Sequence, residues 1–129
     1  MRYIFILVFG FCFLCAQPTK SHATSIVLPQ IGEWVLGNFQ SRGYWYPGVV
    51  ARADVNGVTI KYDDGDVETL PYQRMRPYNW GIGSRVECNF QNSGQWYKGT
   101  IQQLGGTALA INYDDGDFER TRTGLCRSR

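Results

Sequence analysis

An internal repeat constrains the fold of this chain more than any other feature of its sequence. Residues 31–68 match residues 82–119 without a gap, each residue aligning with the one 51 positions further along. The pentapeptide YDDGD stands at the same place in both copies, at residues 62–66 and 113–117. Agreement over this length indicates a tandem duplication of a unit of about fifty residues. The two copies are predicted to form separate small domains at residues 31–79 and 80–129.

Each copy is expected to consist of short β-strands, because no window shows a helical period. Apolar and polar residues alternate at residues 58–62 and 108–113, as in half-buried strands. An Asp-Gly pair follows each of these segments and is typical of a hairpin turn. The pattern predicts an all-β chain of two tandem, strongly bent five-stranded barrels. The expected strands are residues 34–39, 45–52, 58–62, 67–70 and 73–76 in the first copy and 85–90, 96–103, 108–113, 118–121 and 124–127 in the second.

The first residues have the pattern of a secretory signal peptide. Arg2 precedes an apolar run at residues 3–16, and a polar stretch follows. The run is shorter than the roughly 20 residues that a membrane span needs. We predict a signal peptide at residues 1–23 and a leader segment at residues 24–30, with cleavage after Ala16 and an uncleaved anchor as alternatives. The cleaved protein is then secreted or periplasmic and has no membrane span.

Removal of the signal peptide changes the charge and the chemistry that the chain can support. The full chain has 13 basic and 11 acidic residues, and Arg2 and Lys20 leave with the leader, so the remainder is formally neutral. Nucleic-acid binding is therefore not expected. His22, the single histidine of the sequence, leaves as well, which argues against histidine-based catalysis and histidine metal sites. We expect a protein that is not an enzyme and that carries no cofactor and no metal.

Cys88 and Cys126 are the two cysteines that remain after cleavage. In an exported chain such a pair is most often a disulfide, with two unpaired buried thiols as the alternative. In the repeat alignment these cysteines correspond to Gly37 and Met75. A disulfide therefore predicts that the first and last strands of each unit lie side by side.

Two segments of each copy carry a resemblance to a known family. Residues 39–48, FQSRGYWYPG, are followed by the acidic turn at residues 62–66, and residues 90–99, FQNSGQWYKG, by the turn at residues 113–117. This arrangement resembles Tudor domains, in particular tandem Tudor modules that read methylated lysine. The resemblance covers nearly all of the chain after the signal peptide and implies two small barrels with one ligand pocket each.

The resemblance also implies which residues form the pockets. In the family, three aromatic residues and a carboxylate of the turn surround the ligand. Aromatic faces attract a methylated ammonium, which water solvates less strongly than a bare one, and the carboxylate adds charge attraction. The alternative is that these rings only fill the barrel cores and that the acidic turns are solvated hairpin tips. The ligand-binding positions carried over are Phe39, Tyr46, Tyr62 and Asp64 in the first copy and Phe90, Tyr97, Tyr113 and Asp115 in the second.

The sequence favours a secreted binding protein with two equivalent pockets. The resemblance implies methylated lysine, methylated arginine or a similar methylammonium group as the ligand. A bivalent carbohydrate-binding lectin is the alternative, because aromatic rings and carboxylates also bind sugars, and two sites on one chain add avidity. A structural module with no small ligand is the third possibility. Trp45 and Trp96, one residue out of phase with the proposed pockets, are expected to pack in the core or between the barrels.

Overall fold

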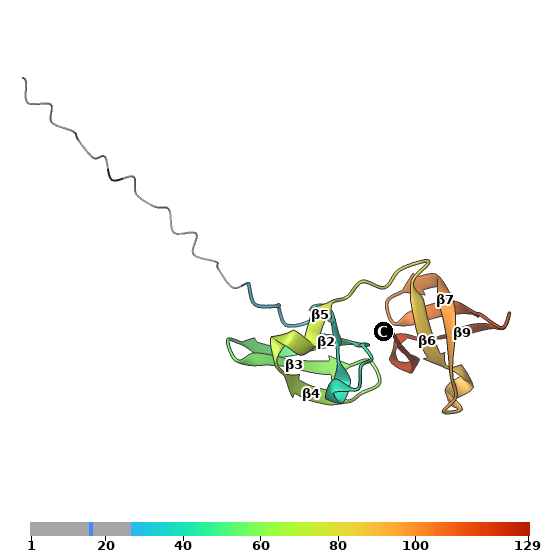
Figure 1. Ribbon diagram of the computed structural model, residues 1–129, viewed down its shortest axis with the longest axis horizontal. Helices are drawn as coiled ribbons and strands as arrows, with labels where there is room; N and C mark the ends of the chain where they lie inside the picture. Colours follow the sequence, from blue (N-terminus) through green and yellow to red (C-terminus); the bar gives the residue numbers. More distant parts are fainter. Residues whose placement is uncertain (1–15, 17–26) are drawn as a thin grey trace, which may run out of the picture.

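The computed structural model describes residue 16 and residues 27–129. Apart from Ala16, the predicted signal peptide at residues 1–23 lies outside the described residues. Within the part of the chain that is described, no helix has the length and apolar character to cross a membrane. Over residues 27–129 the regular structure consists of ten strands and four short 3-10 turns, arranged as two lobes joined by a short connection (Figure 1).

The first lobe is a five-stranded antiparallel sheet with the strand order β4-β3-β2-β1-β5. Two 3-10 turns precede β2 and β5 in the chain, and they redirect it between strands. The elements are β1 (Trp34–Gly37), η1 (Phe39–Ser41), β2 (Tyr46–Asp54), β3 (Gly57–Tyr62), β4 (Val67–Leu70), η2 (Tyr72–Arg74) and β5 (Met75–Pro77).

The second lobe repeats this topology with the strand order β10-β6-β7-β8-β9. The tandem all-β organisation predicted from the repeat is therefore present in the structure. The elements are β6 (Arg85–Asn89), η3 (Phe90–Asn92), β7 (Trp96–Gly105), β8 (Ala108–Tyr113), β9 (Phe118–Arg122), η4 (Thr123–Leu125) and β10 (Cys126–Arg127).

The prediction of closed barrels was wrong. Within residues 27–129, β4 and β5 remain the two edges of the first sheet, and β9 and β10 remain the edges of the second. The last predicted strand of each copy is too short to close the sheet, because its first residues form the turns η2 and η4. Phe39 and Phe90, expected at strand ends, instead begin the 3-10 turns η1 and η3.

Each sheet bends sharply across its second strand. A bulge interrupts the β2–β3 register between Val50 and Arg52, and an equivalent bulge lies between Ile101 and Gln103. Gly48 allows the strands to cross closely, because a Cβ there would lie 2.6 Å from the Lys61 carbonyl oxygen. Bulges and glycine contacts of this kind increase local twist, which folds five short strands around a small core.

The disulfide predicted from the sequence joins the first and last strands of the second lobe. Cys88 on β6 pairs with Cys126 on β10, and their Cα atoms are 4.0 Å apart. In the first lobe the equivalent residues, Gly37 and Met75, are also register partners. Cys88 and Cys126 are both fully buried. The disulfide therefore holds an edge strand of only two residues against its sheet.

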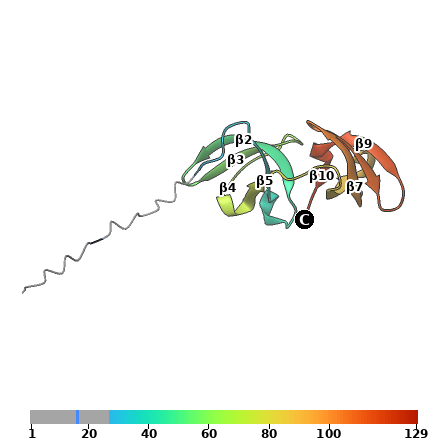
Figure 2. The same ribbon diagram turned by 90° about the horizontal axis from the view of Figure 1, so that it is seen from above.

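The lobes pack on each other through the chain's last four residues, residues 126–129, which we call the C-terminal clamp. Trp45 and Ser128 exchange two backbone hydrogen bonds of 2.8 and 2.9 Å. The Ser128 hydroxyl also accepts a bond from the Trp80 indole at 3.2 Å. The guanidinium of Arg76 stacks 4.1 Å from the Trp45 ring centroid. Figures 1 and 2 both place the C-terminus between the lobes, and Trp45 packs there as predicted.

Apolar residues from both lobes and from their connection fill the interface. Leu36 of β1 is fully buried and belongs to the core cluster of the second lobe, whereas its neighbour Val35 belongs to the cluster of the first. Tyr78 and Trp80, from the connection, pack against the second cluster as well. Burial of this apolar surface fixes the relative position of two units that would each bury too little alone.

Candidate functional site

Three predicted pocket residues of the first lobe meet in a corner, which we call the first aromatic corner: Phe39, Tyr46 and Tyr62. Their ring centroids lie 6.1, 5.4 and 6.4 Å apart, and each pair is nearly perpendicular, at 80°, 84° and 83°. Edge-to-face contacts of this geometry are favourable for aromatic pairs. Tyr62 is only 2% exposed and forms the floor, while Phe39 and Tyr46 are partly exposed and form the walls.

The turn η1 positions Phe39 and has a left-handed backbone. Gln40 and Ser41 have φ angles of 52° and 56°, which non-glycine residues adopt at a cost of order 1 kcal/mol or more. The Gln40 N–H donates to the carboxylate of Glu68 at 3.1 Å, which ties the turn to β4. This hydrogen bond therefore offsets the backbone strain of η1, the turn that places the Phe39 ring in the corner.

Glu68 connects the turn, the tyrosine and a cation in one network. Its carboxylate accepts the Tyr62 hydroxyl at 3.0 Å and the Arg74 guanidinium at 2.6 Å. Burial opposes ionisation of Glu68, but the hydrogen bonds from Arg74, Gln40 and Tyr62 outweigh it and lower its pKa. Burial and the adjacent Glu68 raise the pKa of Tyr62, so this phenol stays protonated and donates to the carboxylate.

The acidic turn after β3 contributes carboxylates to the mouth of the first aromatic corner. Asp64 accepts the backbone N–H of Asp66 at 2.9 Å, an interaction that orders the turn. Its pKa is raised, mainly because burial disfavours the charged form. Asp63 is instead used between the lobes, where it accepts the Thr123 hydroxyl at 2.5 Å. Asp64, the carboxylate expected at the first pocket, lines the same cavity as Phe39, Tyr46 and Tyr62.

The second lobe repeats the aromatic geometry closely. Phe90, Tyr97 and Tyr113, the second aromatic corner, have centroid separations of 6.1, 5.6 and 6.3 Å and interplanar angles of 88°, 83° and 81°. Glu119 plays the part of Glu68, accepting the Tyr113 hydroxyl at 2.6 Å and the N–H of the residue after Phe90 at 2.8 Å. All eight predicted pocket residues thus gather into two groups of four.

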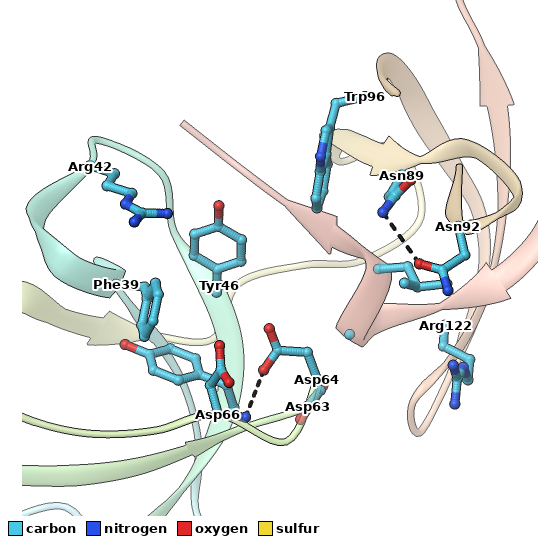
Figure 3. Close-up of a pocket in the computed structure, with 13 residues that line it drawn as sticks. Phe39, Arg42, Tyr46, Asp63, Asp64, Asp66, Asn89, Asn92, Trp96 and Arg122 are labelled. Atoms are coloured by element: carbon cyan, nitrogen blue, oxygen red, sulfur yellow. Dashed lines mark hydrogen bonds between the residues drawn. The ribbon is translucent and has the colours of Figure 1, made fainter. Parts of the chain in front are cut away.

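The two groups nevertheless line cavities of very different size, contrary to the expected equivalence. The cavity at the second aromatic corner measures about 110 Å³ and is lined by residues of the second lobe alone. The cavity at the first corner measures about 480 Å³ and continues onto the other lobe, so we call it the composite cavity (Figure 3). Its far wall consists of Asn89, Asn92, Trp96, Arg122, Gly124 and Leu125.

Arg127 of the C-terminal clamp holds the walls of the composite cavity together. Its guanidinium lies 3.7 Å from the ring centroid of Tyr44 and 4.1 Å from that of Trp96. It pairs with Glu87 at 3.1 Å and donates to the Tyr46 hydroxyl at 3.3 Å. One arginine therefore links a wall of the first aromatic corner to the second lobe.

The residues that sequence reasoning missed fall into two kinds. Glu68 and Glu119 align in the repeat, and this alignment was a usable signal for their shared role. The far wall and Arg127 gave no such signal, because their contacts join residues that are distant in the chain. Trp96, expected only as packing, also lines the composite cavity of the other lobe.

The composite cavity has the size of a small-molecule pocket and is rich in charge. Carboxylates of the turn face it together with two arginines, Arg42 and Arg122. Across residue 16 and residues 27–129, no group of three or more histidine, cysteine or acidic side chains is arranged to hold a metal ion. Aromatic walls, a polar rim and this volume are suited to binding a small polar or cationic ligand.

Comparisons with known proteins give little beyond this. Neither a protein-family model nor a curated protein sequence matches the chain. One similar solved structure is the crystal structure of ADCP1 tandem Agenet domain 3-4, with a TM-score of 0.37 and 14% sequence identity over 78% of this chain and 79% of that chain. Similarity at this level carries no argument about the ligand.

Proposed function

We propose that this protein is a non-enzymatic binding protein that holds a methylated ammonium group, as in methylated lysine or arginine, at the first aromatic corner. The observation that carries the proposal is the mutually perpendicular arrangement of Phe39, Tyr46 and Tyr62 beside Asp64, at the head of a cavity of about 480 Å³. Partly exposed aromatic faces attract such a cation at little desolvation cost. The Asp64 carboxylate adds attraction and accepts any N–H that remains.

The raised pKa of Asp64 supports this role. Burial disfavours its charged form in the empty protein, and a bound cation restores the balance. Cation binding should therefore weaken as pH falls through the raised pKa, since protonation removes the charge. The second aromatic corner offers the same rings in a smaller cavity, and we propose that it binds the same group less tightly.

The test compares matched substitutions in the two lobes. Phe39→Leu keeps an apolar side chain but removes the ring, and no side-chain hydrogen bond is lost. We expect binding of trimethyl-lysine, measured by calorimetry, to weaken about tenfold in Phe39→Leu and to change less in Phe90→Leu. Unmethylated lysine serves as the control ligand. Equal binding of trimethyl-lysine by the parent protein and by a variant carrying both substitutions would rule the proposal out.

A glycan ligand is the second candidate, supported by the far wall of the composite cavity. Asn89 and Asn92 present amides there, and Trp96 presents a ring on which a sugar can stack. A glycan array on the same protein separates the two candidates. High salt separates them further, because screening weakens a carboxylate–cation contact more than it weakens stacking on a neutral sugar.

Export is part of the same proposal. The Cys88–Cys126 disulfide is compatible with an oxidising compartment outside the cytosol. Mass spectrometry of the protein recovered from culture medium or periplasm tests this, since cleavage after Ala23 gives a chain that begins at Thr24. Recovery of the intact chain with its first residues from the cytosol would contradict it.

A further inference from the structure

We propose that the ligand of the composite cavity is a small zwitterion, in which an anionic group lies close to the methylated ammonium and is held by Arg42. The inference rests on the proposed function of the first aromatic corner and narrows its ligand class. It starts from a feature that a site for a simple cation does not explain, namely a positive charge at the mouth of the aromatic corner.

Arg42 lies directly beside the rings. Its guanidinium carbon is 5.8 Å from the ring centroid of Phe39, and the side chain extends toward Tyr46 (Figure 3). Arg42 lines the same cavity as Asp64 and follows the left-handed residue Ser41, which fixes where its side chain starts. The guanidinium is thus placed at the entrance by the same turn that places the Phe39 ring.

Arg42 has no acidic partner among residues 27–129. The ion pairs of this part of the chain involve Arg74, Arg85, Arg127 and Arg129, and Arg42 is in none of them. An unpaired guanidinium repels an incoming cation, so it lowers the affinity for a ligand that carries positive charge alone. It raises the affinity for a ligand that also brings an anion, because guanidinium binds phosphate and carboxylate through charge-assisted hydrogen bonds.

Charges of opposite sign therefore lie on opposite sides of the first aromatic corner, while Arg122 lies across the cavity on the far wall. Asp64 and Asp66 lie below the aromatic corner and suit the ammonium end, whereas Arg42 lies at the opposite side of the rings and suits the anionic end. Phosphocholine has this pattern, with a trimethylammonium and a phosphate on a two-carbon spacer. The chemistry would be the same for the free compound and for the headgroup of a lipid.

The repeat supplies an internal control. The residue equivalent to Arg42 in the second lobe is Ser93, which brings no charge to the second aromatic corner. The rings of the two corners agree to within 0.2 Å in their separations and to within 8° in their interplanar angles. Preference for a zwitterion should therefore be a property of the first lobe alone.

The experiment measures calorimetric dissociation constants of choline and phosphocholine for the purified protein. We expect phosphocholine to bind about tenfold more tightly than choline. In Arg42→Gln this preference should disappear, with phosphocholine binding more weakly and choline binding as tightly as before or more tightly, since the repulsion is gone. Arg52→Gln is the matched control, because Arg52 is an exposed arginine of the same lobe that does not line the composite cavity, so its removal should leave the preference intact.

A gain of preference in the second lobe gives an independent check. Ser93→Arg, introduced together with Arg42→Gln to remove the preference of the first corner, should restore a preference for phosphocholine over choline that then belongs to the second lobe. Vesicles of phosphatidylcholine distinguish the source of the headgroup. Binding to vesicles as well as to phosphocholine indicates a lipid, and binding to phosphocholine alone indicates a free or differently attached group, both in agreement with the inference.

Two other results would overturn the inference in distinguishable ways. If choline and trimethyl-lysine bind, but phosphocholine binds no more tightly and Arg42→Gln changes nothing, the ligand is a simple cation and the proposed function remains. If none of these compounds binds, both the inference and the proposed function fail. A preference that is lost equally in Arg42→Gln and Arg52→Gln would show general electrostatics in place of a site.

Discussion

The two aromatic corners have closely similar ring geometry but lie in different surroundings. Their ring separations agree to within 0.2 Å, as in the 5.4 Å between Phe39 and Tyr62 and the 5.6 Å between Phe90 and Tyr113. Yet the first opens into a cavity of about 480 Å³ and the second into one of about 110 Å³. Duplication preserved the local geometry, and the packing of one lobe against the other made the two sites unequal.

The difference arises because, among residues 27–129, the other lobe contributes to the cavity of the first corner and not to that of the second. The turn η4 and the C-terminal clamp of the second lobe lie against the acidic turn and β2 of the first. The acidic turn of the second lobe is instead closed by its own residues, with Asp114 bound by both Nη atoms of Arg85 at 2.6 Å. A tandem repeat therefore need not give two equivalent sites.

The largest effect is expected from removing the disulfide that anchors the C-terminal clamp. Replacement of Cys88 and Cys126 by serine should lower the free energy of unfolding of the second lobe by about 3–4 kcal/mol, since the bridge closes a separation of 38 residues. The composite cavity should open as well, because β10 has only two register pairs with β6. Chemical denaturation followed by tryptophan fluorescence measures the change.

A reciprocal variant places a cysteine pair in the first lobe. Gly37→Cys with Met75→Cys places a cysteine pair at the equivalent position of the first lobe, but a Cβ on residue 37 would overlap the Tyr62 hydroxyl. We therefore expect no comparable gain in stability. A gain as large as the loss in the second lobe would show that the two lobes are interchangeable at this position.

A single added methyl group can disturb the contact between η4 and the acidic turn of the first lobe. Gly124→Ala places a Cβ 2.7 Å from the Asp63 carbonyl oxygen, so the lobes must separate slightly, at a cost of about 1–3 kcal/mol. Binding at the first aromatic corner should weaken, while the second corner is unaffected. Gly105→Ala is the control, because nothing lies within 4 Å of a Cβ at that position. Equal melting temperatures of the two variants would contradict this account of the interface.

The two glutamates that hold the tyrosines should differ in importance. Glu68→Gln removes the partner of Arg74 and should cost about 1–3 kcal/mol, whereas Glu119→Gln should cost less, because Leu125 stands where the arginine would be. The matched pair is compared by urea denaturation at neutral pH. Equal losses in the free energy of unfolding of the two variants would mean that the ion pair of Glu68 with Arg74 contributes nothing to stability.

The pH dependence of stability gives a second measurement at Glu68. The pKa of this carboxyl is lower in the folded protein than its unfolded value of 4.5. Its contribution to the free energy of unfolding is therefore fully present above pH 4.5 and is lost as pH falls through the folded pKa. Stability of the parent protein should therefore decline in this acidic range, and the decline should be shallower in Glu68→Gln. Parallel curves would contradict the assignment.

The smallest effect is expected at Tyr78, between the lobes. Its hydroxyl is buried without a hydrogen-bond partner among the described residues, and burial and the charge of Asp63 raise its pKa to about 12. Tyr78→Phe removes an unsatisfied polar atom and should leave stability unchanged or raise it by up to about 1 kcal/mol. Above pH 10, where the unfolded tyrosine ionises, the parent should lose stability that the variant keeps. A clear loss of stability on substitution would show that the hydroxyl has a partner.

Much of the candidate site follows from patterns that are local in the chain. Tyr62 ends β3 and opens the YDDGD turn. Trp45 and Tyr46 are consecutive residues at the start of the second strand, and they pack against the cores of different lobes. The repeat then places Phe90, Tyr97 and Tyr113 by the same arithmetic. Pairing of the first and last strands, inferred from the alignment of cysteines with Gly37 and Met75, is also present.

The parts that the sequence did not reveal depend on contacts between distant residues. The Asp63–Thr123 bond joins residues 60 positions apart, and the bond from Arg127 to Tyr46 joins residues 81 positions apart. Neither shows a spacing or a periodicity. The open edges of the sheets were missed because η2 and η4 take up residues that were expected to belong to the last strand of each copy.

By itself, the sequence determined two repeated antiparallel sheets and one disulfide, because short-range alternation, turn residues, an aligned duplication and a pair of cysteines encode them. The two sets of three rings with a carboxylate were implied by the resemblance to Tudor domains. The tertiary structure alone decided that one set faces the other lobe and becomes a composite cavity while its twin stays small. The physical reason is that lobe packing is set by side chains such as Arg127 and Trp45, whose partners are fixed only once both sheets have formed.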